Sequence, residues 1–243
     1  MDYKRILTIQ DISCVGQCSL TVALPILSAC GLETAILPSA VLSTHTMGFE
    51  GFTVRDLSDD MPKIAKHWDK EGIKFDGIYT GYLGSTDQID YVIDIFNKLM
   101  AEGGKKIVDP AMADYGKLYP AFDMVFVEAM KKLVATSDLT IPNITEAAFL
   151  TGINYKETYD EAYIDSLIDG LLKLGAKEII LTGVSYDEKT TGIVVAGNTS
   201  KKYYRHEKLP LSCHGTGDVY ASAFVGAYMH GKSAYEAAGI AGE

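Results

Sequence analysis

Short apolar runs alternate along this chain with longer stretches in which apolar residues recur every three or four positions. A short run bounded by glycine, proline or polar residues predicts a buried strand, and the wider spacing predicts an amphipathic helix. One helix is predicted over residues 85–104, where Ser85 is the N-cap and Gly103 and Gly104 end it. The predicted strands are residues 4–10, 33–43, 76–84, 105–110, 137–143, 177–183, 191–197 and 201–208, and the other predicted helices are residues 55–72, 122–136, 145–152, 161–175 and 218–231, with one more from Ser233.

This order of elements predicts an α/β fold. Strands that alternate with helices favour a mostly parallel central sheet with helices on both faces. The chain has 243 residues and shows no repeat, low-complexity tract or linker, so we expect residues 1–243 to form a single domain. Residues 44–54 combine glycines and aromatic residues and are predicted to form a small flap or short hairpin.

Residues 12–32 carry no charged side chain, and this run is long enough to cross a bilayer. Gln17, Pro25 and several serines and glycines interrupt it, so we interpret it as a loop that leads into a buried helix. Too few residues separate Arg5 from Asp11 to form the apolar region of a signal peptide. We therefore expect no membrane partner and no export.

The charge balance excludes one class of partner. Lysine and arginine number 22 against 32 aspartates and glutamates, which gives a net charge of −10. A nucleic-acid binder needs a basic surface, so no nucleic-acid partner is expected, and any anionic ligand must be held by local features. The four cysteines complete no zinc-ligand set and are not needed to staple a chain of this size, which favours a cytoplasmic location.

Polar residues follow several predicted strands, where ligands bind in open α/β sheets. Each has an ordinary alternative, because Ser13 and Asn143 are also good helix caps and Asp109 with Pro110 also forms turns. Their recurrence at strand ends predicts one shared crevice. The polar strand ends are Gln10–Ser13, Thr80–Tyr82, Asp109–Pro110, Asn143–Glu146 and Thr182–Gly183.

The segment Cys213–Asp218 precedes a strongly apolar helix and contains two closely spaced glycines. Such a backbone can point successive N–H groups at one anion, and the helix N-terminus adds partial positive charge. Asp218 beside this anion hole suggests a base for phosphoryl transfer to a hydroxyl, although a helix dipole lowers the pKa of an aspartate, and a simple capping role stays open. The P-loop motif is absent, and the dinucleotide fingerprint does not fit.

These motifs together resemble a known family. Gly215–Asp218, Asp109–Pro110 and the later Asn143 with Glu146 resemble the ribokinase superfamily of small-molecule kinases. Ser13, residues 43–46 and residues 80–85 are similar to its pyridoxal/pyridoxamine kinase branch, the vitamin B6 kinases. The agreement runs in the same order from residue 4 to the end of the chain.

The resemblance implies phosphorylation of the 5′-hydroxymethyl group of pyridoxal, pyridoxamine or pyridoxine, with ATP and Mg²⁺. It makes Asp218 the base and places the anion hole at Gly215, Thr216 and Gly217. It also implies a homodimer, and a family chain that continues for a few dozen residues beyond Glu243. By the same resemblance Ser13, Thr46 and Tyr82 line the pyridine pocket, Asn143, Thr182 and Asp109 contact the nucleotide, and Asp109 and Glu146 lie near Mg²⁺.

Three other functions stay open. A hydroxymethylpyrimidine kinase of thiamine synthesis shares the His-Gly-Thr-Gly run but usually has cysteine where this chain has Asp218. A sugar or nucleoside kinase of the superfamily would have a longer lid and a more polar pocket. A catalytically silent vitamer-binding protein would not need Asp218.

Overall fold

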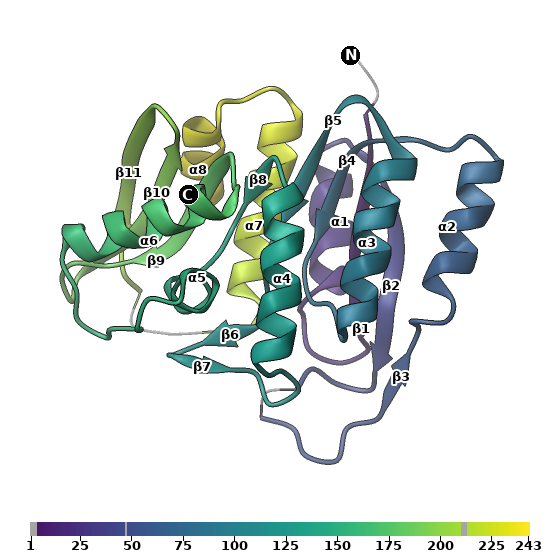
Figure 1. Cartoon of the computed structure of the whole chain (residues 1–243), viewed down its shortest axis with the longest axis horizontal. Coiled ribbons are helices and arrows are strands. Elements are labelled where there is room, and N and C mark those ends of the chain that lie inside the picture. Colours follow the sequence, from purple (N-terminus) through teal and green to yellow (C-terminus); the bar gives the residue numbers. More distant parts are fainter. Residues whose placement is uncertain (1–3, 47, 210–212) are drawn as a thin grey trace.

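The computed structural model describes residues 4–46, 48–209 and 213–243, and in this part of the chain nine strands form one sheet in the order β11-β10-β9-β8-β5-β4-β1-β2-β3 (Figure 1). The six strands from β9 to β2 are parallel, whereas β3, β10 and β11 run antiparallel to their neighbours. The bounds are β1 Arg5–Ser13, β2 Glu33–Leu42, β3 Val54–Asp56, β4 Phe75–Thr80, β5 Met100–Val108, β8 Leu139–Thr140, β9 Glu178–Val184, β10 Thr190–Gly197 and β11 Ser200–Glu207.

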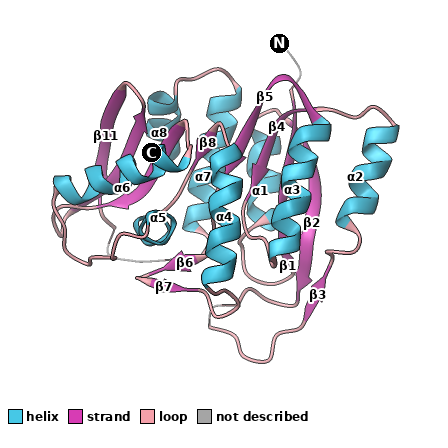
Figure 2. Cartoon of the chain, viewed as in Figure 1, coloured by secondary structure: helices cyan, strands magenta, loops and turns pink. Residues whose placement is uncertain are grey.

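Helices cover both faces of the sheet (Figure 2). The first group encloses a core that includes Phe75, Phe96 and Leu133, and the second encloses a core that includes Tyr79 and Phe224. The predicted architecture, a mostly parallel sheet between two helical layers, is therefore confirmed. The first group is α2 Met61–Lys70, α3 Thr86–Leu99, α4 Met124–Thr136, α5 Ile144–Thr151 and α6 Glu161–Leu174, and the second is α1 Leu20–Ala29, α7 Thr216–Met229 and α8 Ala234–Gly242.

Two predicted helices are shorter than expected. The helix predicted over 85–104 ends at Leu99, because Met100 is already extended and pairs with Phe75 on β4. Residues 55–72 were expected to be one helix, yet their first two residues belong to β3, which pairs with the end of β2. Strand pairing outweighs helical spacing in both places.

Three other segments differ from or refine the sequence prediction. Residues 137–143 contain only the two-residue strand β8. The hairpin of β6 (Ala113–Asp114) and β7 (Lys117–Leu118) was not predicted. The flap joins two antiparallel strands, β2 and β3, and the Ser43 N–H donates to the Thr53 carbonyl at 3.0 Å across its base.

The uncharged run 12–32 contains the end of β1, a loop and α1, as its polar residues predicted. Within the described residues we find no helix with the length and hydropathy that crossing a bilayer requires.

Candidate active site

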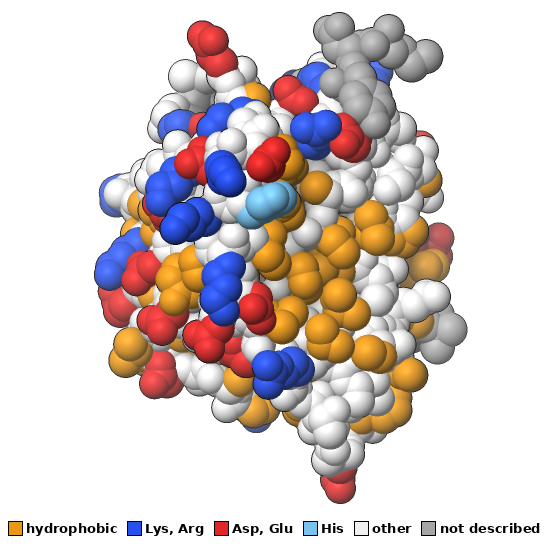
Figure 3. Space-filling view, turned by 90° about the vertical axis from the view of Figure 1, so that its right-hand side faces the viewer, with side chains coloured by type: hydrophobic (Ala, Val, Ile, Leu, Met, Phe, Trp, Pro, Cys, Tyr) orange, Lys and Arg blue, Asp and Glu red, His pale blue; other side chains and the backbone are white. Residues whose placement is uncertain are grey.

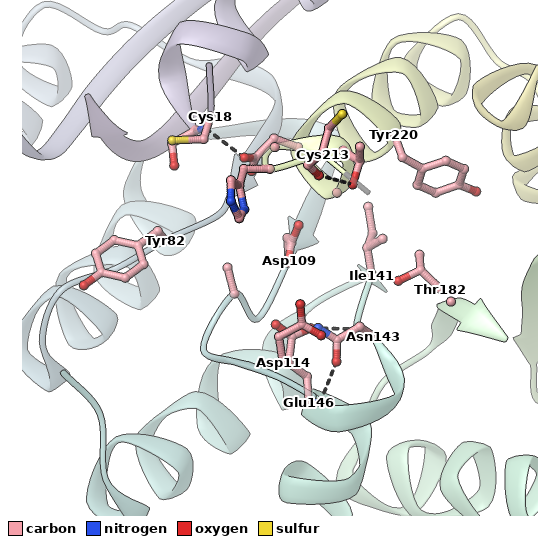
Figure 4. A pocket seen from close by; sticks show the side chains of 18 of the residues that line it. Cys18, Tyr82, Asp109, Asp114, Ile141, Asn143, Glu146, Thr182, Cys213 and Tyr220 are labelled. Carbon is pink, nitrogen blue, oxygen red and sulfur yellow. Dashed lines mark hydrogen bonds between the residues drawn. The ribbon is translucent and has the colours of Figure 1, made fainter. Parts of the chain in front are cut away.

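A cavity of about 610 Å³ lies where the carboxyl ends of the central strands meet the N-termini of α5 and α7 (Figure 4). It extends from Tyr82 and Cys18 on one side to Thr182 and Tyr220 on the other, with Asp109 between them. The shared crevice predicted from the strand ends is thus present. Every site residue predicted from the sequence lines it, namely Ser13, Thr46, Tyr82, Asp109, Asn143, Glu146, Thr182, Gly215, Thr216, Gly217 and Asp218.

The backbone before α7 has the open, glycine-dependent geometry that the predicted anion hole requires. Gly215 is the N-cap residue and has a φ of 78°, and a Cβ there would collide with the Gln17 carbonyl oxygen. The first intrahelical bond runs from Val219 N–H to the Gly215 carbonyl, so the N–H groups of residues 216–218 precede the helical ladder. A Cβ on Gly217 would meet no atom within 4 Å, so this backbone is open to a ligand.

Asp218 lies in the first turn of α7 and faces the cavity. Its Oδ2 accepts a hydrogen bond from the Ser19 N–H at 2.9 Å. Burial raises the pKa of Asp218 to about 6, with a smaller contribution from the charge of Asp11, while the Ser19 hydrogen bond acts against the rise. The sequence led us to expect that the helix dipole lowers the pKa of Asp218. This pKa is raised instead, because desolvation is the larger effect.

Asp109 and Glu146 bring two carboxylates to the floor of the cavity. Glu146 is buried, and its two oxygens accept N–H hydrogen bonds from Met112 at 3.2 Å and from Asn143 at 2.8 Å. Burial raises the pKa of Asp109 well above its usual range, and the charge of Glu146 adds to the rise. Burial also raises the pKa of Glu146 to about 8.

This pair fits a magnesium ion. Within the described residues no three acidic, histidine or cysteine side chains form a closed metal cage. Magnesium in kinases is usually held by one or two carboxylates together with water and substrate phosphates, so a closed cage is not required. Asp109 and Glu146 would hold the ion, partly through water, and its charge would favour their ionised forms.

The raised pKa of Glu146 predicts how stability depends on pH. Its pKa rises from 4.5 in the unfolded chain to about 8 in the folded protein, so the folded state holds the extra proton. The free energy of unfolding without ligands should therefore fall as pH rises from about 4.5 to about 8, by on the order of a few kcal/mol. Urea unfolding at a series of pH values measures this.

Glu146→Gln should make that decline shallower and leave the part due to the raised pKa values of Asp109 and Asp218, whereas Glu157→Gln, at an exposed glutamate, should leave the decline as in the parent protein. An equally steep decline in Glu146→Gln would show that another group carries the effect.

Ser13, Tyr82 and Thr46 lie at the end of the cavity expected to take the acceptor substrate. The Ser13 hydroxyl donates to Asp11 Oδ2 at 3.0 Å. The Tyr82 ring is half-buried, and its centroid is 5.3 Å from that of Phe122. Thr46 is exposed on the flap. An aromatic side chain in the same cavity as polar ones suits a flat heteroaromatic ligand.

Thr182 and Asn143 lie toward the other end and are linked by strand-like pairing. The Thr182 hydroxyl donates to the Pro142 carbonyl at 3.3 Å. Asn143 caps α5, since its Oδ1 accepts from the Glu146 N–H at 2.9 Å while Glu146 bonds back to the Asn143 N–H. The capping role that sequence left open for Asn143 is therefore present, and its side chain still borders the cavity.

The cavity also contains residues that sequence reasoning did not assign. Asp11 follows the polar pattern of the β1 end, but only Ser13 was selected there. Asp114 and Tyr119 come from the β6–β7 hairpin and the turn after it, which left no signal in the hydrophobic pattern. His45 and His214 also line the cavity, with ring centroids 5.2 Å apart.

Residues 27–243 match the model of the phosphomethylpyrimidine kinase family. The chain belongs to this family. The pyridoxal kinases among the relatives that follow confirm the predicted kinship with the ribokinase-like pyridoxal kinases and show that the chain is a kinase that transfers a phosphoryl group to an alcohol.

Solved structures of similar proteins support the family assignment. A Bacteroides thetaiotaomicron protein, assigned provisionally to the phosphomethylpyrimidine kinases, is 36% identical, with a TM-score of 0.94, all of this chain covered and 84% of that one. A second crystal form of it contains pyridoxal. Pyridoxal kinase from Lactobacillus plantarum is 32% identical, with a TM-score of 0.90, 98% of this chain covered and 84% of that one. Among curated proteins, Dictyostelium discoideum pyridoxal kinase is 28% identical over 239 residues, which cover 91% of this chain and 77% of that one.

Proposed function

We propose that this family member phosphorylates the 5′-hydroxymethyl group of B6 vitamers with ATP. The observation that carries the proposal is Asp218, a carboxylate of raised pKa, set directly after the Gly215–Gly217 backbone in one cavity with an aromatic acceptor end. The pyridoxal kinase from L. plantarum and the pyridoxal-containing B. thetaiotaomicron crystal support the choice of substrate.

In the proposed reaction Asp218 accepts the proton of the 5′-hydroxyl as that oxygen attacks the γ-phosphorus of ATP. The new P–O bond forms while the bond to the β–γ bridging oxygen breaks, and ADP leaves. N–H groups of residues 215–217 stabilise the charge on the transferring phosphoryl group. Magnesium, held by Asp109 and Glu146, would neutralise charge on the phosphates. Asn143 and Thr182 contact the nucleotide, and Ser13, Thr46 and Tyr82 hold the ring.

A hydroxymethylpyrimidine kinase is the second candidate, because a Bacillus subtilis relative that is 26% identical over 209 residues is named a hydroxymethylpyrimidine/phosphomethylpyrimidine kinase. One assay separates the candidates: ADP formation with pyridoxal, pyridoxamine, hydroxymethylpyrimidine and ribose offered separately. We expect turnover with at least one B6 vitamer, at a kcat/KM above that for the other two acceptors. Turnover of hydroxymethylpyrimidine alone would favour the second candidate. If the protein bound vitamers but formed no ADP, it would be a vitamer-binding protein without kinase activity, the third alternative left open by the sequence.

The proposal includes a homodimer. Figure 3 shows a broad hydrophobic surface on the face of the molecule that lies at the right of Figure 1. The helix α1 carries no charged residue, and its Pro25 is exposed and its Leu24 half-buried. Contiguous apolar surface of this kind marks protein interfaces. The free thiols of all four cysteines suit the proposed cytoplasmic location.

A further inference from the structure

Asp11 is a buried carboxylate in the cavity to which the proposed reaction gives no role. It follows Gln10 near the end of β1, is 4% exposed, and lines the cavity. The Ser13 hydroxyl donates to its Oδ2 at 3.0 Å. Burial raises the pKa of Asp11, and hydrogen bonding by the Ser19 and Ser13 hydroxyls partly offsets the rise.

Asp11 lines the same cavity as Tyr82 and the proposed base Asp218. Its negative charge raises the pKa of the Tyr82 hydroxyl on one side and of Asp218 on the other, in each case after the larger effect of burial. Ser19 links the two carboxylates, since its hydroxyl bonds to Asp11 and its N–H to Asp218 Oδ2 at 2.9 Å. A ring that stacks on Tyr82 and offers its hydroxymethyl group to Asp218 therefore presents a further substituent or ring atom to Asp11.

The backbone of Ser19 supports a functional arrangement here. It has a φ of 51° and a ψ of −130°, a conformation that side chains rarely adopt, and it is buried. Such conformations cost free energy and concentrate at functional sites. At Ser19 this conformation directs one N–H at Asp218 while the hydroxyl faces Asp11.

The charges of the cavity indicate what Asp11 binds. Five carboxylates and neither lysine nor arginine are found among the described residues that line it. No ion pair to Asp11 occurs within the described residues. Burying an uncompensated carboxylate is costly, and a cationic ligand removes that cost. The five are Asp11, Asp109, Asp114, Glu146 and Asp218.

Four of these carboxylates lie away from the acceptor ring. Figure 4 shows Asp114 and Glu146 beside Asn143, with Asp109 nearer the middle of the cavity. Asp218 meets the hydroxyl in the proposed reaction. The thiol of Cys18 does not compete for a cation as a thiolate, because burial and the neighbouring charges of Asp11 and Asp218 raise its pKa.

We propose that Asp11 recognises a protonated nitrogen of the acceptor substrate and so selects cationic vitamers. This inference rests on the proposed function. Two nitrogens share the required chemistry, the protonated ring nitrogen and the ammonium group of pyridoxamine. Both place an N–H donor against a carboxylate, and hydrogen bonds between charged groups are the stronger ones in proteins.

The test is Asp11→Asn, which has the same shape and can still accept from the Ser13 hydroxyl. The KM for pyridoxamine should rise by about 10- to 100-fold, the range expected for losing a hydrogen bond between charged groups. The KM for ATP should stay within a few fold. Pyridoxine has the ring nitrogen but no ammonium group, so it distinguishes the two nitrogens. A rise in KM confined to pyridoxamine identifies the ammonium group, and an equal rise in KM for both vitamers identifies the ring nitrogen. Asp90→Asn, at an exposed aspartate, is the matched control.

An unchanged KM for both acceptors in folded Asp11→Asn would overturn the inference, as would a rise confined to the KM for ATP. A measurement on the parent enzyme needs no variant: inhibition by benzyl alcohol, pyridine-3-methanol and 2-(aminomethyl)benzyl alcohol. At least one nitrogen compound should inhibit about tenfold more strongly than benzyl alcohol, and equal inhibition by all three contradicts the role of Asp11. A parent enzyme that turns over no vitamer refutes the proposed function itself, which is a separate result.

Discussion

Asp218→Asn is expected to lower kcat by about 10²- to 10⁴-fold, the usual contribution of a positioned general base. Asparagine keeps an oxygen that can accept from the Ser19 N–H, so the geometry of the loop is retained while the base is lost. The KM for the vitamer should change little. Because burial raises the pKa of Asp218 to about 6 and the ionised form is the base, kcat/KM of the parent enzyme should increase as pH rises through about 6. In Asp218→Asn, kcat/KM should not show this increase near pH 6.

Steady-state kinetics between pH 5 and 8 measure both effects, with Asp169→Asn as a control because Asp169 is an exposed aspartate on α6. The mechanism would be wrong if Asp218→Asn kept a rate within about tenfold of the parent. If kcat/KM of Asp218→Asn still increased near pH 6, a different group would titrate there.

Gly215→Ala should reduce kcat by about 10²- to 10³-fold, comparable to the loss of one donor from an oxyanion hole. The reason is steric: Gly215 has a φ of 78°, and the added Cβ would meet the Gln17 carbonyl oxygen. The backbone must shift, which moves the N–H groups that would face the phosphoryl group in the proposed reaction. We also expect a loss of about 1–3 kcal/mol in the free energy of unfolding, the usual cost of a strained conformation.

Gly217→Ala is the matched comparison for this prediction. Its Cβ would meet no atom within 4 Å, so the melting temperature should match that of the parent. Activity kinetics and thermal melts on both variants separate a steric change in the loop from a general loss of stability. A Gly215→Ala enzyme with parental kcat would contradict an anion hole at this backbone.

The alternation of strands and helices was predictable because it depends on local spacing. The pairing of strands was not. The local sequence of residues 100–104 predicts the end of a helix, but these residues belong to β5, which pairs with β4. Val54–Asp56 forms a strand because it pairs with the edge of β2. The β6–β7 hairpin depends on contacts with α5, including the bond from Gly116 N–H to the Thr145 hydroxyl at 3.1 Å. Such contacts leave no periodic pattern in the sequence.

The site was predictable as far as it follows strand ends and the Gly215–Asp218 motif. Its electrostatics required the structure, because desolvation depends on what surrounds a group. Sequence could place Asp218 at a helix start, where the dipole lowers its pKa, but not count the buried neighbours that raise it to about 6. Asp11 escaped selection for the same reason, since its importance comes from burial without a cationic partner.

The two outer strands of the sheet have a different consequence. An open strand edge can pair with another chain and nucleate aggregation, so proteins protect such edges. Here β11 carries Lys201, Lys202 and Arg205 along one edge, and β3 at the other edge is only three residues long. Repulsion between positive charges disfavours pairing of a second chain with β11. The short length of β3 disfavours such pairing at the other edge. Copies of this enzyme should therefore associate through side-chain surfaces rather than by extending the sheet from one molecule to the next.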